Sequence, residues 1–311
     1  MSRFLVTGAA GFIGSHIAEK LISDGHDVRV LDNLSTGRRE NLGTFGDNIT
    51  FIEGDIRNAE TVSEAVSGVE CVIHQAALAS VPRSIADPSA TNEVNVQGTL
   101  NLLEAARKES VRRFVYASSS SVYGDGRALP KHEEMVPEPK SPYAVSKLAG
   151  ELYCRVYREI HGLETVSLRY FNVFGPRQAR DSQYADVVPI FVSSLLAGRS
   201  AEIFGDGEQS RDFTYVANVV AANLHACQAS VTPKAVYNVA CGQRFTLNSL
   251  YERLQNMVRS NVKPRYAEPR VGDVRHSQAS IDAIQRDLGY EPQVDLDEGL
   301  GRTLEWYRQA V

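Results

Sequence analysis

Along this chain, short segments of mainly apolar residues alternate with longer segments in which apolar and polar residues are mixed. Short, mainly apolar runs occupy residues 4–7, 28–31, 49–52, 72–74, 114–117 and 166–169. Between them, residues 13–23, 59–66, 92–108 and 143–160 have the spacing of helices with one apolar face. Short apolar runs in this setting are typical of strands buried on both faces of a parallel sheet. Residues 1–172 therefore predict a doubly wound α/β domain.

The alternation loosens after residue 172. Glycine- and proline-containing turns at residues 174–176 and 205–207 separate helical segments near 187–196, 247–258 and 298–307. A helical segment at 216–226 and a short strand at 236–239 predict that the chain returns to the first domain near residues 213–240. We expect the rest of residues 173–311 to form a smaller C-terminal domain.

Composition narrows the class of protein. A chain of 311 residues with 43% hydrophobic content can bury a full core. Its net charge of −5 gives no general attraction to nucleic acid or anionic lipid. No apolar run approaches the about 20 residues of a membrane span, and the first residues enter a strand directly, so we expect a cytoplasmic protein. The cysteines lack the spacing of a zinc site or disulfide framework, and no metal is expected: Cys71, Cys154, Cys227 and Cys241.

A glycine-rich turn lies between the first predicted strand and helix. Gly8, Gly11 and Gly14, with Phe12 and Ile13 between the last two, permit a tight turn that a pyrophosphate can approach. The following helix N-terminus favours negative charge, although the same glycines also suit an ordinary strand–helix turn.

An acidic residue ends the second predicted strand, 18 residues after the glycine turn. A carboxylate at Asp32 would accept hydrogen bonds from the adenosine ribose and repel a 2′-phosphate, which favours NAD over NADP. The alternative is an aspartate that only caps the turn after its strand. Asp55, after the third strand, is placed to meet the adenine. Together these features predict a Rossmann-type NAD site.

Tyr143 and Lys147 stand four residues apart in a predicted helix, so their side chains share one face. A nearby ammonium favours the phenolate, and we expect Lys147 to lower the pKa of Tyr143 until the phenol can accept a proton. The spacing is weak support alone, because the chain contains 13 tyrosines.

Several longer motifs support this interpretation over essentially the whole length. The chain resembles an extended short-chain dehydrogenase/reductase, and specifically a nucleotide-sugar epimerase. The motifs that carry the resemblance, besides the glycine turn, are Asp32-Asn33-Leu34, His74-Gln75-Ala76-Ala77, the serines at 118–121 before Val122-Tyr123-Gly124, Ser141-Pro142-Tyr143-Ala144-Val145-Ser146-Lys147, residues 169–176, and Gly205-Asp206-Gly207 followed by Arg211-Asp212-Phe213.

The resemblance implies roles for the catalytic residues. Tyr143 would be the general base, Lys147 would hold the nicotinamide ribose, and Ser119 would hydrogen-bond the reacting sugar hydroxyl. Ser119 is chosen by counting back from Val122-Tyr123-Gly124, and Ser120 remains an alternative. Similar dehydratases carry Thr-Asp-Glu at residues 119–121, and similar decarboxylases carry glutamate at Ser121. The hydroxyls found here favour oxidation at C4 followed by re-reduction on the opposite face.

The resemblance also implies contacts with the cofactor and the substrate. Further NAD contacts would come from Asn33, Ser35, Gly37, Ile56, Gln75, Ala76, Ala77, Asn95 and Tyr170. The UDP-sugar would be held by Ser80, Arg83, Asn172, Val187, Val188, Ile203, Phe204, Arg211, Arg270, Asp273 and Ser277, besides the catalytic residues and Ser120. The guanidinium groups of Arg211 and Arg270 suit a diphosphate, although both could be ordinary surface charges.

Ser277 bears on which sugar is bound. Epimerases restricted to UDP-glucose and UDP-galactose resemble this segment but carry tyrosine at the matching position, whereas serine leaves space for an N-acetyl group. Ser80 is available to hydrogen-bond that group. We therefore expect interconversion of UDP-GlcNAc and UDP-GalNAc, with the unacetylated pair as secondary substrates.

The alternatives are a UDP-glucose 4-epimerase, a UDP-uronate 4-epimerase and a non-catalytic dinucleotide sensor. The resemblance further implies a homodimer, joined through the helices at 92–108 and 143–160 as a four-helix bundle.

Overall fold

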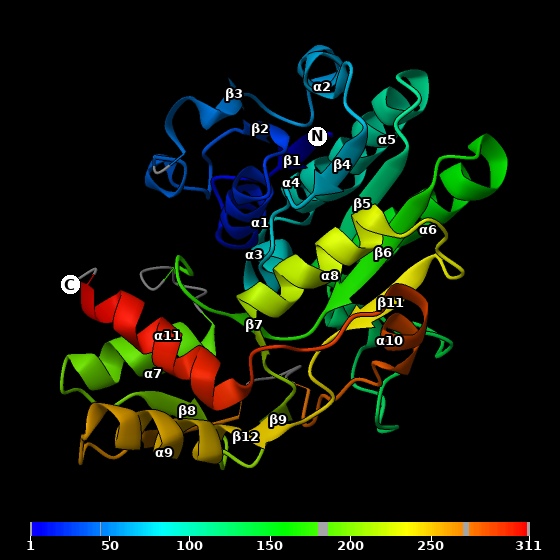
Figure 1. Cartoon of the computed structure of the whole chain (residues 1–311). Helices are drawn as coiled ribbons and strands as arrows, with labels where there is room; N and C mark the ends of the chain where they lie inside the picture. The colour runs from blue at the N-terminus through cyan, green and yellow to red at the C-terminus, as the bar shows by residue number, and fades with distance from the viewer. Residues whose placement is uncertain (1, 44, 180–185, 270–273, 310–311) are drawn as a thin grey trace.

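A seven-stranded parallel sheet forms the centre of the larger lobe (Figure 1). The computed structural model describes residues 2–43, 45–179, 186–269 and 274–309. The strand order of the sheet is β11-β6-β5-β4-β1-β2-β3. The strands are β1 (Arg3–Thr7), β2 (Asp27–Asp32), β3 (Ile49–Glu53), β4 (Cys71–His74), β5 (Arg113–Ser119), β6 (Thr165–Tyr170) and β11 (Val236–Val239). The predicted α/β fold class is confirmed, and each predicted strand lies within three residues of its observed bounds.

Helices cover both faces of this sheet. α1 (Phe12–Ser23) and α8 (Val216–Gln228) pack together on one face, where α8 crosses the sheet in yellow in Figure 1. α2 (Ala59–Val66), α5 (Gly98–Lys108) and α6 (Pro142–His161) cover the other face. Consecutive residues of β1 enter opposite cores, since Leu5 packs under α2 and α5 while Val6 faces α1 and α8. Both faces are therefore apolar.

The predicted helix over residues 92–108 is helical throughout but contains a π-helical stretch. α3 (Val81–Ala86) and α4 (Pro88–Asn92) precede a π-helical turn, η3 (Glu93–Gln97), and only then does α5 begin. Such π-turns often accompany functional residues because they redirect one side chain. Here the turn carries the buried Asn95, whose amide donates to the Ser146 hydroxyl on α6 at 2.9 Å.

A second, smaller lobe lies beside the sheet, at the bottom of Figure 1. α7 (Val187–Leu196), α9 (Leu247–Val258) and α11 (Leu296–Gln309) share one apolar core there. Short strand pairs lie in this lobe and beside it: β7 (Val173–Phe174) with β10 (Thr214–Tyr215), β8 (Glu202–Phe204) with β13 (Arg265–Ala267), and β9 (Ser210–Arg211) with β12 (Phe245–Thr246). α10 (Asp282–Leu288) returns to pack on β11.

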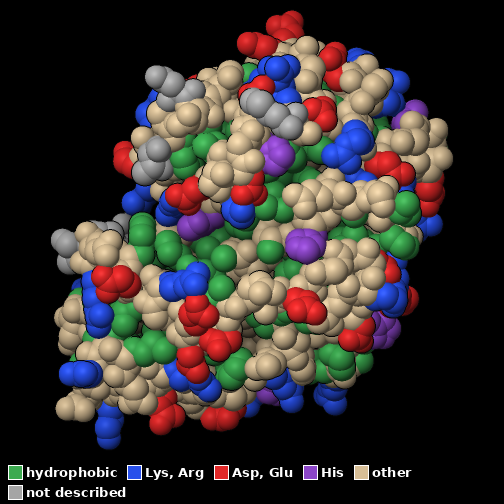
Figure 2. All heavy atoms as spheres, in the orientation of Figure 1, with side chains coloured by type: hydrophobic (Ala, Val, Ile, Leu, Met, Phe, Trp, Pro, Cys, Tyr) green, Lys and Arg blue, Asp and Glu red, His purple; other side chains and the backbone are tan. Residues whose placement is uncertain are grey.

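Acidic and basic side chains are interspersed over the face seen in Figure 2, in keeping with the small net charge. Among the described residues, no helix has the length and apolar character needed to cross a membrane.

A buried ion pair ties α6 to the sheet. Arg169 on β6 donates from Nε and Nη2 to the two carboxylate oxygens of Glu151 at 2.9 and 2.7 Å, and both side chains are 4% exposed. The Ser118 hydroxyl donates to the same carboxylate, and the Arg169 guanidinium lies over the Tyr123 ring. A bidentate pair of this kind restricts both the rotation and the height of α6 on the sheet.

Substitution Arg169→Met would leave Glu151 buried without its counter-charge. We expect the free energy of unfolding to fall by about 3–5 kcal/mol, measured by urea denaturation. Arg155→Ala is the matched control, because it removes the exposed pair between Arg155 and Glu159 on the same helix and should leave the midpoint unchanged. Equal losses in the two variants would contradict the importance of the buried pair.

Candidate active site

The carboxyl ends of the parallel strands bring the predicted functional residues to one edge of the sheet. β1 leads into Gly8, β2 ends at Asp32, and β4 leads into Gln75. β5 ends at Ser119, and Asn172 follows β6. Ligands of open parallel sheets bind at this edge.

The turn after β1 is packed too closely for side chains. Gly8 has a φ of +69°, and a Cβ there would lie 2.6 Å from the Ala76 nitrogen. A Cβ on Gly14 would lie 2.2 Å from the Gly8 oxygen. Gly11 occupies the cap position of α1, where Phe12 and Ile13 begin the helix. Because glycine has no side chain with which to cap them, the first N–H groups of α1 suit a pyrophosphate.

Asp32 has a structural role in the turns at this edge of the sheet. Its carboxylate accepts hydrogen bonds from the N–H groups of Ala10 at 2.9 Å and Leu34 at 2.8 Å, and burial raises its pKa. The capping alternative is therefore real, but a carboxylate has about four acceptor positions and can serve a ribose as well. Gly37 closes on the same loop, since a Cβ there would lie 2.7 Å from the Ala10 Cβ.

The residues expected at the adenine form a small polar group beyond β3. Arg57 donates to the Asp55 carboxylate at 2.8 Å, and this hydrogen bond lowers the pKa of Asp55 to about 2. Asn33 also donates to Asp55, at 2.8 Å, and accepts from the Ser35 N–H at 3.1 Å. Ile56 is buried beside them. Asp55 thus remains ionised at neutral pH.

The segment after β4 is held by polar contacts from both sides. The Gln75 amide donates to the Tyr170 hydroxyl at 2.9 Å, and that hydroxyl donates to Asn223 on α8 at 3.0 Å. The N–H of Ala76, which precedes Ala77, donates to the Thr7 hydroxyl at 3.2 Å. Asn223 was not predicted. Its position within an apolar helix, 148 residues from Gln75, gives it no local motif.

Ser119, Tyr143 and Lys147 lie close together near the carboxyl end of β5. Ser141 caps α6 by accepting from the Ala144 N–H at 3.1 Å, which places Tyr143 in the first turn. The Ser119 hydroxyl lies close enough to the Tyr143 hydroxyl to lower the pKa of that phenol. The Lys147 ammonium donates to the Ala117 oxygen at 2.8 Å and lies 6.0 Å from the centre of the Tyr143 ring. The structure therefore brings the three predicted catalytic residues together.

The predicted effect of Lys147 on Tyr143 is wrong for the protein alone. Burial raises the pKa of Tyr143 to about 12, the negative charge of Asp186 adds to the rise, and the Ser119 hydrogen bond opposes it. Burial also lowers the pKa of Lys147 to about 8. The spacing predicted the proximity but not the desolvation, which disfavours the charged form of each group.

The two candidate serines occupy different elements. Ser119 ends β5, whereas Ser120 begins the 3₁₀ turn η4 (Ser120–Tyr123). The Ser121 hydroxyl donates to the Ser119 oxygen at 2.9 Å, and the Ser121 N–H donates to it at 3.2 Å. With both of these bonds accepted, the Ser119 proton is left to face Tyr143.

The expected substrate residues lie between the two lobes and in the smaller one. Asn172 donates to the Asp212 oxygen at 3.0 Å, and Arg211 donates to the main-chain oxygens of Ser210 and Arg275 at 3.0 and 3.3 Å. The Ser277 N–H donates to the Ser210 oxygen at 2.9 Å, so Ser277 lies beside the strand that carries Arg211.

Other predicted substrate residues have roles in packing or capping. Val188 and Ile203 are buried in the core of the small lobe, so any contact with a ligand would use their main chain. Val187 is partly buried at the start of α7. Ser80 caps α3 by accepting from the N–H of Arg83 at 3.2 Å, which leaves its hydroxyl proton free to donate.

A shallow pocket adjoins Phe204 in the small lobe. Its lining comes from the turn after β8, from β13 and from Arg275: Gly205, Asp206, Tyr266, Ala267, Glu268, Pro269 and Arg275. The predicted Arg270 and Asp273 lie outside the described residues. Within the part of the chain that is described, no three His, Cys, Asp or Glu side chains gather as a metal site.

This chain is similar along its full length to sugar-nucleotide enzymes. It is 42% identical over 310 residues to a UDP-glucose 4-epimerase of Mycolicibacterium smegmatis, covering 98% of each chain. A UDP-N-acetylglucosamine 4-epimerase from Methanobrevibacter ruminantium, solved with UDP-N-acetylmuramic acid, superposes with a TM-score of 0.96 at 40% identity, covering 100% of this chain and 99% of the other. The Thermus thermophilus UDP-glucose 4-epimerase, solved with NAD, gives 0.90 at 39% identity and covers 99% and 100%.

The family follows from the same region that builds the cofactor site. Residues 4–240 match the NAD dependent epimerase/dehydratase family, and they include the glycine turn, Asp32, Ser119, Tyr143 and Lys147. The glycine cradle and the acceptor positions of Asp32 fit a dinucleotide. The chain belongs to the NAD-dependent epimerase/dehydratase family, and its cofactor is NAD.

Proposed function

We propose that this protein is an NAD-dependent UDP-sugar 4-epimerase that interconverts UDP-GlcNAc and UDP-GalNAc and also accepts UDP-glucose and UDP-galactose. The proximity of Ser119 to Tyr143, with hydroxyls rather than carboxylates at residues 119–121, carries the choice of reaction. Residues 1–172, with the return near 213–240, would bind NAD. Residues 173–311 would bind the UDP-sugar.

The chemistry assigns a separate task to each catalytic side chain. Tyr143 accepts the proton of the sugar C4 hydroxyl as hydride leaves C4, and returns it when hydride comes back to the opposite face. Ser119 orients that hydroxyl and stabilises the phenolate by donating to it. Lys147 orients the nicotinamide ribose and supplies positive charge. Bound NAD supplies the hydride acceptor and, when oxidised, a positive ring charge that favours the phenolate.

The preference for an acetylated sugar rests on Ser277. Its small side chain lies beside the strand that carries Arg211 and leaves room at the position where a phenol would exclude an N-acetyl group. The similarity to the Methanobrevibacter ruminantium UDP-N-acetylglucosamine 4-epimerase supports this preference.

Substitution Tyr143→Phe removes the proton acceptor while keeping the ring. We expect kcat to fall about 10²–10⁴-fold in a coupled assay of UDP-galactose formation, with NAD still retained. Tyr153→Phe on the same helix, where the residue is 37% exposed, should change nothing. Unchanged turnover in Tyr143→Phe would remove Tyr143 from the mechanism.

A panel of UDP-GlcNAc, UDP-GalNAc, UDP-glucose, UDP-galactose and UDP-GlcA tests the substrate. The wild-type protein should turn over the four neutral sugars and not UDP-GlcA. Ser277→Tyr should lower kcat/KM for the acetylated pair by about 100-fold or more and leave the unacetylated pair within about threefold, because the pocket loses only the room for the acetyl group. Ser277→Ala should keep both pairs. Wild-type turnover confined to UDP-glucose and UDP-galactose would refute the assignment.

Two copies of the chain would pair through α5 and α6. α6 exposes apolar side chains at successive turns, with Leu152 53%, Val156 42% and Ile160 70% exposed. An apolar helical stripe of this kind is typical of a surface that is covered in the assembled protein.

Light scattering on the purified protein should therefore give the mass of two chains. Val156→Arg should give the mass of one, because the charge would be buried in the helix pair. Val231→Arg is the control, since Val231 is 67% exposed in the loop between α8 and β11. A wild-type mass of one chain would exclude the dimer.

A further inference from the structure

Asp212 is a fully buried carboxylate at the junction of three segments. The residue is 0% exposed and follows Arg211 directly at the end of β9. Its Oδ1 accepts from the Cys241 N–H at 3.0 Å, and its Oδ2 accepts from the N–H groups of Gly242 at 3.1 Å and Ala279 at 3.2 Å. One side chain thus joins β9, the loop after β11 and the segment that contains Ser277.

The main chain of Asp212 extends this connection to the end of β6. Its carbonyl oxygen accepts from the Asn172 amide at 3.0 Å, and the Thr214 N–H donates to the Asn172 oxygen at 3.2 Å. Asn172 has a φ of +34°, a left-handed conformation that these contacts stabilise. Asp212 therefore contacts or adjoins the segments of three expected substrate residues without facing the substrate itself.

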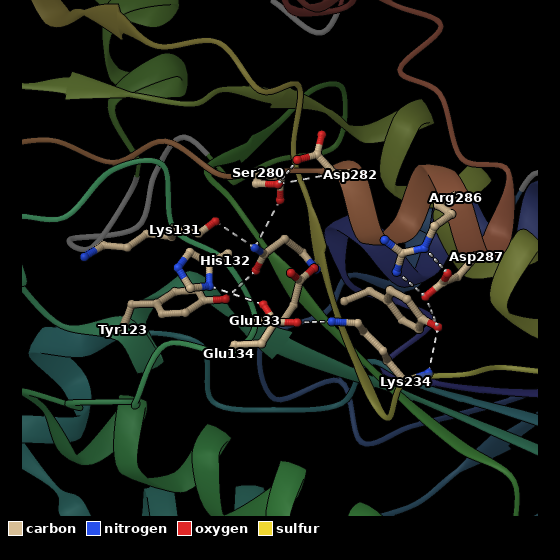
Figure 3. Close-up of polar contacts among 12 residues, drawn as sticks. Tyr123, Lys131, His132, Glu133, Glu134, Lys234, Ser280, Asp282, Arg286 and Asp287 are labelled. Atoms are coloured by element: carbon tan, nitrogen blue, oxygen red, sulfur yellow. Dashed lines mark hydrogen bonds and ion pairs between the residues drawn. The ribbon is translucent and has the colours of Figure 1, made fainter.

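A second anchor holds the segment after Ser277 (Figure 3). The Lys131 oxygen accepts from the Ser280 N–H at 2.8 Å and from the Asn238 amide at 3.0 Å. The same Asn238 amide donates to the Ser280 oxygen at 3.2 Å, and the Tyr123 hydroxyl donates to Asn238 at 2.7 Å. Because Asn238 belongs to β11, this side of the segment is fixed to the rigid sheet. Asp212 fixes the other side.

We propose that Asp212 is a positioning residue for UDP-sugar binding, whose carboxylate holds the segments bearing Arg211, Asn172 and Ser277 in their binding arrangement. This role rests on the proposed function, because it requires these segments to contact a UDP-sugar. It predicts weaker substrate binding without a matching loss in the chemical step, since Ser119, Tyr143 and Lys147 belong to β5 and α6.

The charge of Asp212 changes near neutral pH. Burial raises its pKa to about 7, although the N–H groups favour the ionised form. Cys241 and Tyr290 also face it, and burial raises the pKa of Cys241 to about 12 and that of Tyr290 further above its usual range. Nearby His276, hydrogen-bonded to Ser210 at 2.9 Å, has its pKa lowered by burial and the arginines around it. The pKa of Asp212, at about 7, lies inside the range from pH 6 to 8.

The protonation of Asp212 determines how the KM for the UDP-sugar changes with pH. Above pH 7 the ionised carboxylate accepts every N–H that points at it. Below pH 7 one oxygen of the Asp212 carboxyl group is protonated. Its O–H then faces N–H groups that also donate, so hydrogen bonding is lost and the junction is weakened. The KM for the UDP-sugar should therefore rise as the pH falls from 8 to 6. The substrate does not confuse the measurement, because the diphosphate of a UDP-sugar is a diester with no ionisation in this range.

The test is Asp212→Asn in the full-length protein loaded with NAD. We expect a KM about tenfold higher at pH 8 for UDP-GlcNAc, a kcat within about twofold, and a KM that no longer varies between pH 6 and 8. Asp287→Asn is the control, because Asp287 is also a largely buried carboxylate, 7% exposed on α10, but its hydrogen bonds are with Tyr237 and Arg286. Its KM and pH profile should match the wild type.

A direct measurement of nucleotide binding to the wild-type protein tests the same role if the Asp212→Asn variant folds poorly. Calorimetry of wild-type protein with UDP-GlcNAc and with UDP-glucose should show binding several-fold weaker at pH 6 than at pH 8 for any nucleotide that binds. A flat wild-type profile, an unchanged KM in the folded variant, or a loss confined to kcat would each overturn the role of Asp212. Failure of wild-type protein to bind either nucleotide would overturn the proposed function and this role together.

Discussion

The parallel direction of the seven central strands is the constraint on which the rest of the structure depends. Since every strand runs the same way, the turn at Gly8, the carboxylate of Asp32, the amide of Gln75 and the hydroxyl of Ser119 all meet at one edge. Both faces of the sheet are covered by helices, so this edge is where polar groups can reach a ligand without being buried unpaired. The small lobe then adds the residues that are proposed to bind the substrate.

The proposed catalytic arrangement needs more than strand direction, because Tyr143 and Lys147 come from a helix that lies on one face of the sheet. Apolar contacts alone are non-directional and would allow such a helix to slide or rotate. Two features fix α6. Gly150 allows close approach, since a Cβ there would lie 2.2 Å from the Tyr116 hydroxyl oxygen, and the buried bonds of Glu151 with Arg169 set the rotation. Lys147 stands one turn before Glu151, so the same rotation aims its ammonium at the Ala117 oxygen.

The sequence was most informative where function depends on neighbours in the chain. The glycine turn, Asp32 and the Tyr143–Lys147 pair were each predicted from local spacing, because a strand–turn–helix unit or a single helical turn determines their geometry. Contacts between distant segments were not predictable in this way. Asn223 meets Gln75, and Asp212 meets Ala279, only because the small lobe and α8 fold back on the sheet. The burial of individual side chains could not be predicted from the sequence either. Val188 and Ile203 were therefore expected at the substrate although their side chains lie in a core.

The electrostatics of Tyr143 show why burial and charge have to be considered together. A buried phenol and a buried ammonium each lose hydration when ionised, so in the protein alone the pKa of Tyr143 rises to about 12 and that of Lys147 falls to about 8. The chain alone therefore holds a protonated phenol at neutral pH and is a poor base. A positive charge beside the ring would compensate for the missing hydration, and the site that provides such a charge is the cofactor site itself. In the proposed mechanism the phenolate of Tyr143 therefore forms only when positive charge lies beside the ring.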